Sequence, residues 1–490
     1  MSYKISAPNV YLYAFQLQND SKGSNNPLWK HCDNILANFT DKTVTPNLVF
    51  PQKSHSYRND LLPNVLLGFT SNPPIEGFVQ PLQIQDSYAF CLNIGCPEDG
   101  TADNEDVDLI KEFNPNQALL ISGDDNFLGQ TLLITAWLPE NSSDDLKLLK
   151  PLADKCRNAL FQGNSLPPFY RSGKLFGSPI FEYGSIADIA NYRHLIVWLL
   201  AEKQTDKDFN TCQEEILDLF FHRNKIIKAF QDSRKVYHEL DREYAEIEDD
   251  IEYLQQQLTQ GFSSLAPEKL QSFKEQLKVL LRKGLSYTRL LRKLEDYDNC
   301  IAINLNNYTD ILQKICDILG TDKEELSILN DVSIKIDKEE LSILNNFSIK
   351  TAPYFRSQIA GDLGYFRHGT DLIEQAIASI RGIVEIEQAK NDRTNQIALR
   401  KSEEEEKDRD DRLESTVQAI GVGLAAGGIA ASSGTDKLFE TVQNHQIPVV
   451  MHLHPFAFSF LLSCAIALFA AGITWCVTKP KKNDQNQTGS

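Results

Sequence analysis

The chain has 490 residues, which is more than one ordinary hydrophobic core accommodates, so two or three domains are expected. Its net charge of −18 at pH 7 argues against nucleic-acid binding, because that function needs a basic surface. The nine scattered cysteines do not suggest a disulfide framework, and no apolar signal-peptide core opens the sequence. A reducing cytoplasm is the expected surrounding of the large N-terminal part.

Residues 1–205 predict an α/β or α+β domain with a mixed sheet. Runs of β-branched and aromatic residues predict the strands, and loops rich in Pro, Asn, Gly and Asp separate them, notably at 40–78 and 95–116. Helices are expected at 27–39 and 143–161. The expected strands are 10–17, 88–94, 118–122, 131–138, 180–183 and 194–200.

Residues 206–320 predict an antiparallel coiled-coil hairpin of two long helices, because apolar residues recur three and four apart. The first helix is expected to end before Gly261, and Pro267 suits the first turn of the second. Gly284 and Asp298 interrupt the second seam. The seam residues are Tyr237, Leu240, Tyr244, Ile247, Ile251, Leu254 and Leu258, then Leu270, Phe273, Leu277, Leu280, Tyr287, Leu291, Leu294, Ile301, Leu305, Tyr308 and Leu312.

Residues 322–336 and 337–351 are a tandem duplication, and each copy begins with the same nine residues, DKEELSILN. Two copies are too few for a solenoid, so 321–352 is expected to be an enlarged loop inserted between helices. Residues 353–415 predict a third long helix, a stalk whose apolar seam gives way to a polar, charged stretch.

Two C-terminal stretches, 416–434 and 455–477, predict a transmembrane hairpin within 416–478. The second is free of charged residues, and at ~1.5 Å per residue it is longer than the ~30 Å hydrocarbon core of a bilayer. Lysines in the tail 479–490 and basic residues before 416 place both termini in the cytoplasm by the positive-inside rule. The sequence therefore predicts a multi-pass protein of the cell membrane, with the lipid bilayer as a partner.

Two sets of residues near the first predicted span are the candidate functional residues. Small residues let helices approach closely in lipid, so the glycines are expected at a pore or a helix-packing face: Gly421, Gly423, Gly427, Gly428 and Gly434. In a ring of several chains, the preceding acidic run would form a cation-concentrating vestibule: Glu403, Glu404, Glu405, Glu406, Asp410 and Asp411.

Motifs for catalysis or cofactor binding are not visible. The stretch 123–131 partly resembles a phosphate-binding loop, but it carries Gln130 where that loop needs lysine. A hairpin turn is therefore expected. Cys91 and Cys96 lack a second pair at zinc spacing, and His452 and His454 are too few for a metal site. The sequence predicts a protein that is not an enzyme and has no cofactor; metal ligands cannot be assigned.

An N-terminal α/β domain, a helical hairpin, a stalk, two terminal spans and a Lys-rich tail resemble, in this order, the CorA-like family of divalent-cation transport proteins. The resemblance implies a homo-oligomer whose first span lines a pore, and divalent cations as partners. The family's Gly-Met-Asn motif is absent: Gly434 is followed by Thr435 and Asp436. Two functions stay open: a CorA-like ion channel or membrane effector with a cytoplasmic sensing domain, or a non-conducting, membrane-tethered scaffold that binds partner proteins through its coiled coils.

Overall fold

The computed structural model describes residues 4–18, 23–51, 56–71, 75–96, 105–139, 142, 144–163, 165–185, 192–259, 267–319 and 341–399, with a few positions beyond 416. The chain divides into two compact units. The first unit is Met1–His238 with Arg292–Leu363, and the second is Glu239–Leu291 with Gly364–Ser490.

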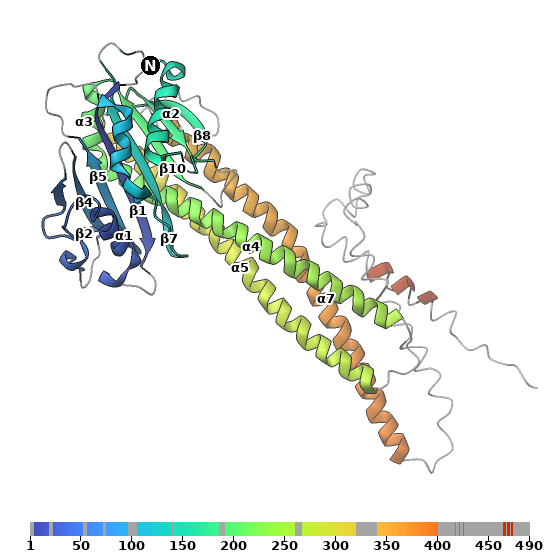
Figure 1. Cartoon of the computed structure of the whole chain (residues 1–490). Helices are drawn as coiled ribbons and strands as arrows, with labels where there is room; N and C mark the ends of the chain where they lie inside the picture. The colour runs from blue at the N-terminus through green and yellow to red at the C-terminus, as the bar shows by residue number, and fades with distance from the viewer. Residues whose placement is uncertain are drawn as a thin grey trace, which may run out of the picture. The chain divides into compact units, whose positions relative to one another are not determined.

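The first unit is built on a mixed sheet of ten strands within the described residues (Figure 1). The order along the sheet is β2-β4-β5-β1-β7-β10-β9-β8, with β3 and β6 paired to β4 and β1. Only the β7–β10 pair is parallel among the described strand pairs. The strands are β1 (Lys4–Leu17), β2 (Arg58–Asp60), β3 (Leu67–Thr70), β4 (Glu76–Ile84), β5 (Ser87–Gly95), β6 (Glu105–Asp106), β7 (Phe127–Trp137), β8 (Phe169–Leu175), β9 (Ser178–Tyr183) and β10 (His194–Leu200).

Both faces of this sheet are covered by helices, and the alternation of side chains along β1 shows how. Val10, Leu12 and Ala14 belong to the core shared with α1 (Pro27–Leu36) and α2 (Leu146–Phe161). The intervening aromatic residues face α3 (Lys203–Thr211) and α4 (Gln213–Thr259): Tyr11 contacts Phe209, Tyr13 contacts Phe220, and Phe15 contacts Phe221. A central strand buried on both faces accounts for the near-continuous apolar character of its sequence.

The prediction of an N-terminal domain with a mixed sheet is confirmed. The strand predicted at 118–122 is wrong: these residues form a turn after the short helix η4 (Pro115–Gln117). The buried Asn114 side chain organises this turn, because its Oδ1 accepts a hydrogen bond from the Leu119 amide. The predicted loops 40–78 and 95–116 contain β2, β3 and β6, which are short strands that give little sequence signal.

Three long helices carry the rest of the described chain: α4, α5 (Pro267–Ile318) and α7 (Ala352–Leu399). Parts of all three form the second unit, whose core contains Leu254, Phe273, Leu280 and Ile380. The two interruptions of the α5 seam have structural roles. A Cβ atom at Gly284 would lie 3.1 Å from Ile373 Cγ2, so glycine permits a close approach of α7 within the second unit. Asp298, in the first unit, pairs with Arg356 at 2.9 Å.

Residues 342–351 of the second copy are helical, where the sequence predicted a loop. Ser342–Asn346 forms α6, and Phe347–Thr351 forms a π-helical turn, η8, that leads into α7. Residues 320–340, which include the first copy, lie outside the described residues.

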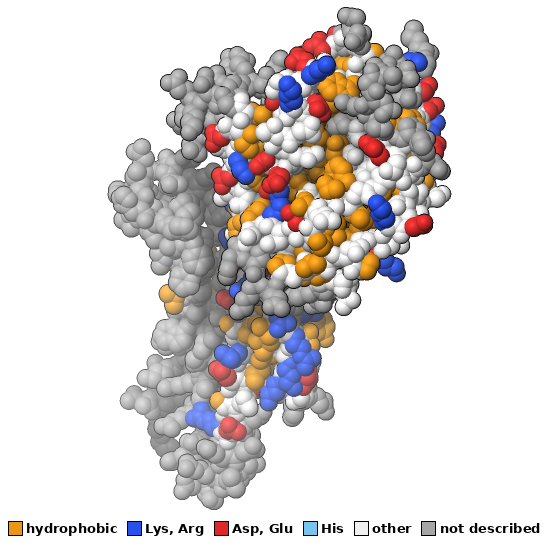
Figure 2. Space-filling model, turned by 90° about the vertical axis from the view of Figure 1, so that its left-hand side faces the viewer, with side chains coloured by type: hydrophobic (Ala, Val, Ile, Leu, Met, Phe, Trp, Pro, Cys, Tyr) orange, Lys and Arg blue, Asp and Glu red, His pale blue; other side chains and the backbone are white. Residues whose placement is uncertain are grey.

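The chain is also locally basic on α5: residues 274–293 contain seven Lys and Arg against one Glu. Figure 2 shows basic side chains gathered on the helical part of the face in view.

The predicted C-terminal transmembrane hairpin is wrong: within the part of the chain that the structure describes, no helix has the length and apolar character to cross a bilayer. Within the two predicted spans the structure describes only residues 417, 421, 425, 464–466, 468–470, 472 and 473. Their other residues lie outside the described ones. The predicted multi-pass membrane localisation and ion-transport role rested on this hairpin, and they find no support in the described residues.

Candidate functional site

A cluster of buried charged residues lies on the face of the sheet that α4 covers. Glu182 of β9 and His194 of β10 point to this face, because their neighbours Tyr183 and Leu195 belong to the core on the opposite face. Arg223 comes from α4 and Arg171 from the edge strand β8. Glu182, His194 and Arg223 are each less than 5% exposed, which is exceptional for charged residues and requires a specific set of partners.

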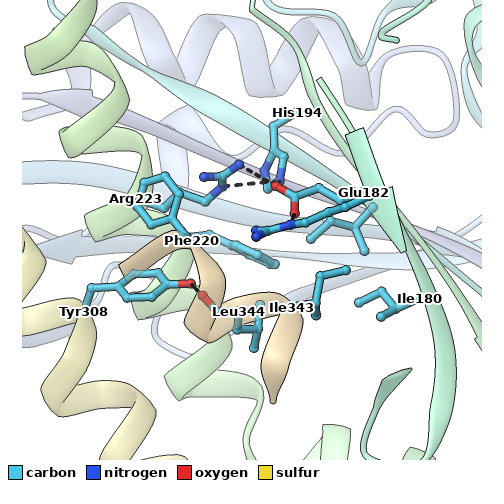
Figure 3. A pocket seen from close by; sticks show the side chains of 11 residues that line it. Ile180, Glu182, His194, Phe220, Arg223, Tyr308, Ile343 and Leu344 are labelled. Carbon is cyan, nitrogen blue, oxygen red and sulfur yellow. Dashed lines mark hydrogen bonds and ion pairs between the residues drawn. The ribbon is translucent and has the colours of Figure 1, made fainter. Parts of the chain in front are cut away.

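Glu182 is the centre of the cluster (Figure 3). Its Oε1 accepts a hydrogen bond from Arg223 Nη2 at 2.6 Å, and its Oε2 accepts one from Arg171 Nε at 2.6 Å. The Nε2 atom of His194 lies 3.2 Å from Oε1. Charge-assisted hydrogen bonds of this length are the strong ones, and they join β8, β9, β10 and α4 in one network.

His194 has hydrogen-bond partners at both ring nitrogens. Its Nε2 atom lies 3.2 Å from Glu182 Oε1, which only accepts, and 3.3 Å from Arg223 Nε, which only donates. Nδ1 lies 2.9 Å from Thr131 Oγ1, and Thr131 in turn accepts from the Asn224 side-chain amide at 3.1 Å. The Thr131 hydroxyl can donate to Nδ1 or accept from it, so a neutral imidazole has a partner for each ring nitrogen in either tautomer.

The pKa values follow from burial and from the arginines. Burial alone would raise the pKa of Glu182, but the charge of Arg223, the hydrogen bond from His194 and the charge of Arg171 outweigh it and hold this pKa well below its usual range. Burial, reinforced by the positive charge of Arg223, lowers the pKa of His194 to about 4. The cluster at pH 7 thus holds two guanidinium cations, one carboxylate and one neutral imidazole, which leaves one positive charge in excess.

A small pocket of about 10 Å³ opens beside this cluster, roughly the room one water molecule requires. Arg171 and Arg223 both line it, and the Nη1 atom of each is buried without a hydrogen-bond partner among the described residues. Glu182 and His194 also line it, and the other walls are mostly apolar, formed by Ile180, Ile196, Phe220, Tyr308, Ile343, Leu344 and Phe347. The Arg223 guanidinium also lies over the Phe347 ring, 4.3 Å from its centroid.

A second buried polar group lies elsewhere in the first unit. His222 Nδ1 lies 2.8 Å from Asn304 Oδ1, and since the Asn304 amide donates to the Cys300 carbonyl, Nδ1–H is the donor. His222 Nε2 is then the acceptor for the Tyr57 hydroxyl at 3.0 Å. Burial lowers the pKa of His222 to about 4. These hydrogen bonds connect Tyr57, the residue before β2, to α4 and α5.

These two histidines predict a loss of stability in mild acid. Each is neutral in the folded protein down to about pH 4, whereas in the unfolded chain it takes up a proton near pH 6.5. The unfolded state therefore binds more protons between pH 6.5 and 4, and stability falls as the pH falls through this window. We expect the free energy of unfolding, measured with urea, to be lower at pH 5 than at pH 7 by about 2 kcal/mol per histidine.

His222→Gln tests the assignment, because a glutamine amide keeps both hydrogen bonds but does not titrate. This variant should lose about half of the difference in unfolding free energy between pH 7 and pH 5. An unchanged difference would show that His222 does not titrate as its surroundings require.

The residues predicted as functional from sequence are not brought together by the described structure. Gly421 is helical and partly exposed, while the other four glycines and all six acidic residues lie outside the described residues. The stretch 123–131 is a turn that leads into β7, with the Phe127 amide donating to the Asp124 carbonyl at 3.0 Å. Among the described residues, no group of three or more His, Cys, Asp and Glu side chains could hold a metal ion. Divalent-cation binding, homo-oligomer formation and partner binding through the helices stay predictions.

Sequence reasoning missed the arginine cluster, although part of a signal was present. Glu182 and His194 stand in strands that were correctly expected to be apolar, and a charged residue in such a strand needs a buried partner. The partners Arg171 and Arg223 come from elements that meet only in the folded chain.

When the chain is compared with family models, with curated proteins and with solved structures, no match is found to any of them.

Proposed function

We propose that the N-terminal sheet domain binds a compact anion between Arg171 and Arg223. One observation carries this proposal: two guanidinium groups line the same pocket, and the Nη1 atom of each is buried without a hydrogen-bond partner among the described residues. Leaving a buried polar N–H group unpaired costs about 1–3 kcal/mol, more when the group is charged. An anion that accepts from both nitrogens removes this cost and neutralises the excess positive charge.

The pocket restricts the anion to a small one. Its volume is close to that of one water molecule, which suits a halide or the end of a small carboxylate better than a phosphate ester. The bound ion would lie among side chains of β8, α4, α5 and α6, since Arg171, Arg223, Tyr308 and Leu344 all line the pocket. Binding would therefore tighten the packing of these helices against the sheet, so the domain responds to an anion through its helices.

The test is the thermal unfolding of the protein with sodium chloride, sodium formate or sodium phosphate at constant ionic strength. A compact anion at 100 times its Kd should stabilise the folded state by about 2.7 kcal/mol. Arg171→Lys should lose this response, because lysine keeps a positive charge for Glu182 but cannot present a second nitrogen to the pocket.

Arg356→Lys is the matched control, because Arg356 pairs with Asp298 on the surface of the same unit. It should keep the full response to the anion. An equal response in the Arg171 and Arg356 variants would mean that the anions act through general salt effects, and the proposal would be rejected.

A further inference from the structure

The second copy of the duplicated segment occupies a well-defined groove in the first unit. Ile343, Leu344 and Phe347 are 4%, 9% and 1% exposed. The Tyr308 hydroxyl donates to the Leu344 carbonyl at 3.0 Å, and its ring contacts that of Phe347. We call this the repeat groove; its walls are Ile180, Ile196, Phe220, Arg223 and Tyr308.

The first copy carries nearly the same residues for the same contacts. Leu326–Asn330 reads LSILN, as does 341–345, and SIK recurs at 333–335 and 348–350. The bond from Tyr308 goes to a main-chain carbonyl, which any residue at that position supplies. Ile343 and Leu344 correspond to Ile328 and Leu329. Three positions differ, since Asp331, Val332 and Ile336 correspond to Asn346, Phe347 and Thr351. The largest change in side-chain size is at the ring over Arg223, where Val332 corresponds to Phe347.

We propose that the repeat groove is a binding site for the motif LSILN, and that the first copy is a second, competing occupant. The segment would then dock in two registers that differ by fifteen residues. The second copy prevails because the Phe347 ring stacks on Arg223 and is fully buried, whereas a valine leaves part of that space empty. This inference does not depend on anion binding.

The connection from α5 is long enough for the first copy to reach the groove. Ile318, the end of α5, is ten residues beyond Tyr308, or ~15 Å along the helix. The eight residues 319–326 can span at most ~26–29 Å when extended. On the other side, the fifteen residues 337–351 would form a loop before Ala352, and the entropy of closing such a loop grows only slowly with its length.

The experiment disables the second copy and asks whether the first replaces it. Leu344→Asp places a carboxylate in the groove and is introduced into the full chain and into a chain lacking residues 322–336. In the shortened chain no substitute exists, and we expect the Tm to fall by about 10 °C or more. In the full chain the first copy takes over, and the Tm should fall by less than about half of that. Equal losses in the two backgrounds would overturn the proposal.

A pair of deletions of equal length provides an independent measurement. A chain without 337–351 presents the first copy directly before Ala352, in the register of the second. We expect it to fold with a Tm a few degrees below that of the chain without 322–336. Val332→Phe in this chain should raise its Tm and remove the difference. Failure of this chain to fold, with or without the phenylalanine, would overturn the proposal. So would folding only as a dimer by mass, since that would mean exchange between chains.

Discussion

Replacing Arg223 with methionine is expected to lower the free energy of unfolding by about 3–5 kcal/mol. The substitution removes the 2.6 Å hydrogen bond to Glu182 Oε1 and leaves that carboxylate buried with only Arg171 as a charged partner. It also removes the donor of the 2.6 Å hydrogen bond to the Tyr192 hydroxyl. An uncompensated buried charge costs far more than an intact pair contributes, so the loss should be large.

Urea unfolding followed by circular dichroism measures the effect, with Arg356→Met as the control. The pair of Arg356 with Asp298 is at the surface, where one ion pair contributes about 0–1 kcal/mol. The double variant Arg223→Met with Glu182→Gln should recover part of the loss, because the buried carboxylate is then gone; Arg171 also loses its partner, but its side chain is 16% exposed. A loss below about 1 kcal/mol for Arg223→Met would show that water reaches Glu182, contrary to its burial.

The strands that the sequence predicted correctly are those buried on both faces. β5, β7 and β10 are nearly continuous apolar runs, and each is recognisable without knowing its neighbours. The turn at 118–122 could not be predicted, because it depends on Asn114, whose side chain also donates to the Leu160 carbonyl of α2. The buried cluster around Glu182 could not be predicted from the sequence for the same reason. Glu182 and Arg223 are 41 residues apart, and only the packing of α4 on the sheet joins them.

The predicted membrane hairpin shows the limit of hydropathy as evidence. An apolar run indicates that its residues are buried away from water. To cross a membrane, the run must also form a continuous helix of about 20 residues. Hydropathy does not report local helix preference, and each glycine in a helix interior costs about 1 kcal/mol relative to alanine. In the second unit, by contrast, the glycines of α5 and α7 have identifiable neighbours, and their effect on stability can be predicted.

Valine in place of Gly369 is expected to destabilise the second unit by about 3 kcal/mol, at the upper end of the cost of overpacking a core. A Cβ atom there would lie 2.4 Å from Tyr287 Oη and 2.8 Å from Tyr244 Cδ2. Tyr287 cannot move away easily, because it is fully buried and donates a 2.7 Å hydrogen bond to the Phe366 carbonyl. The new side chain must therefore displace a ring and break this bond, or bend α7.

Gly382, in the same helix, is the matched control, because a Cβ atom there would meet no atom within 4 Å. Valine at this position changes only helix propensity, so the free energy of unfolding should change by less than about 0.5 kcal/mol. Urea unfolding followed by the helical circular dichroism signal measures both variants. Similar effects at the two positions would mean that α7 does not approach Tyr287 closely. A large loss at Gly369 alone would show that glycine serves there as a contact surface, and that the bundle of the second unit packs around Tyr287.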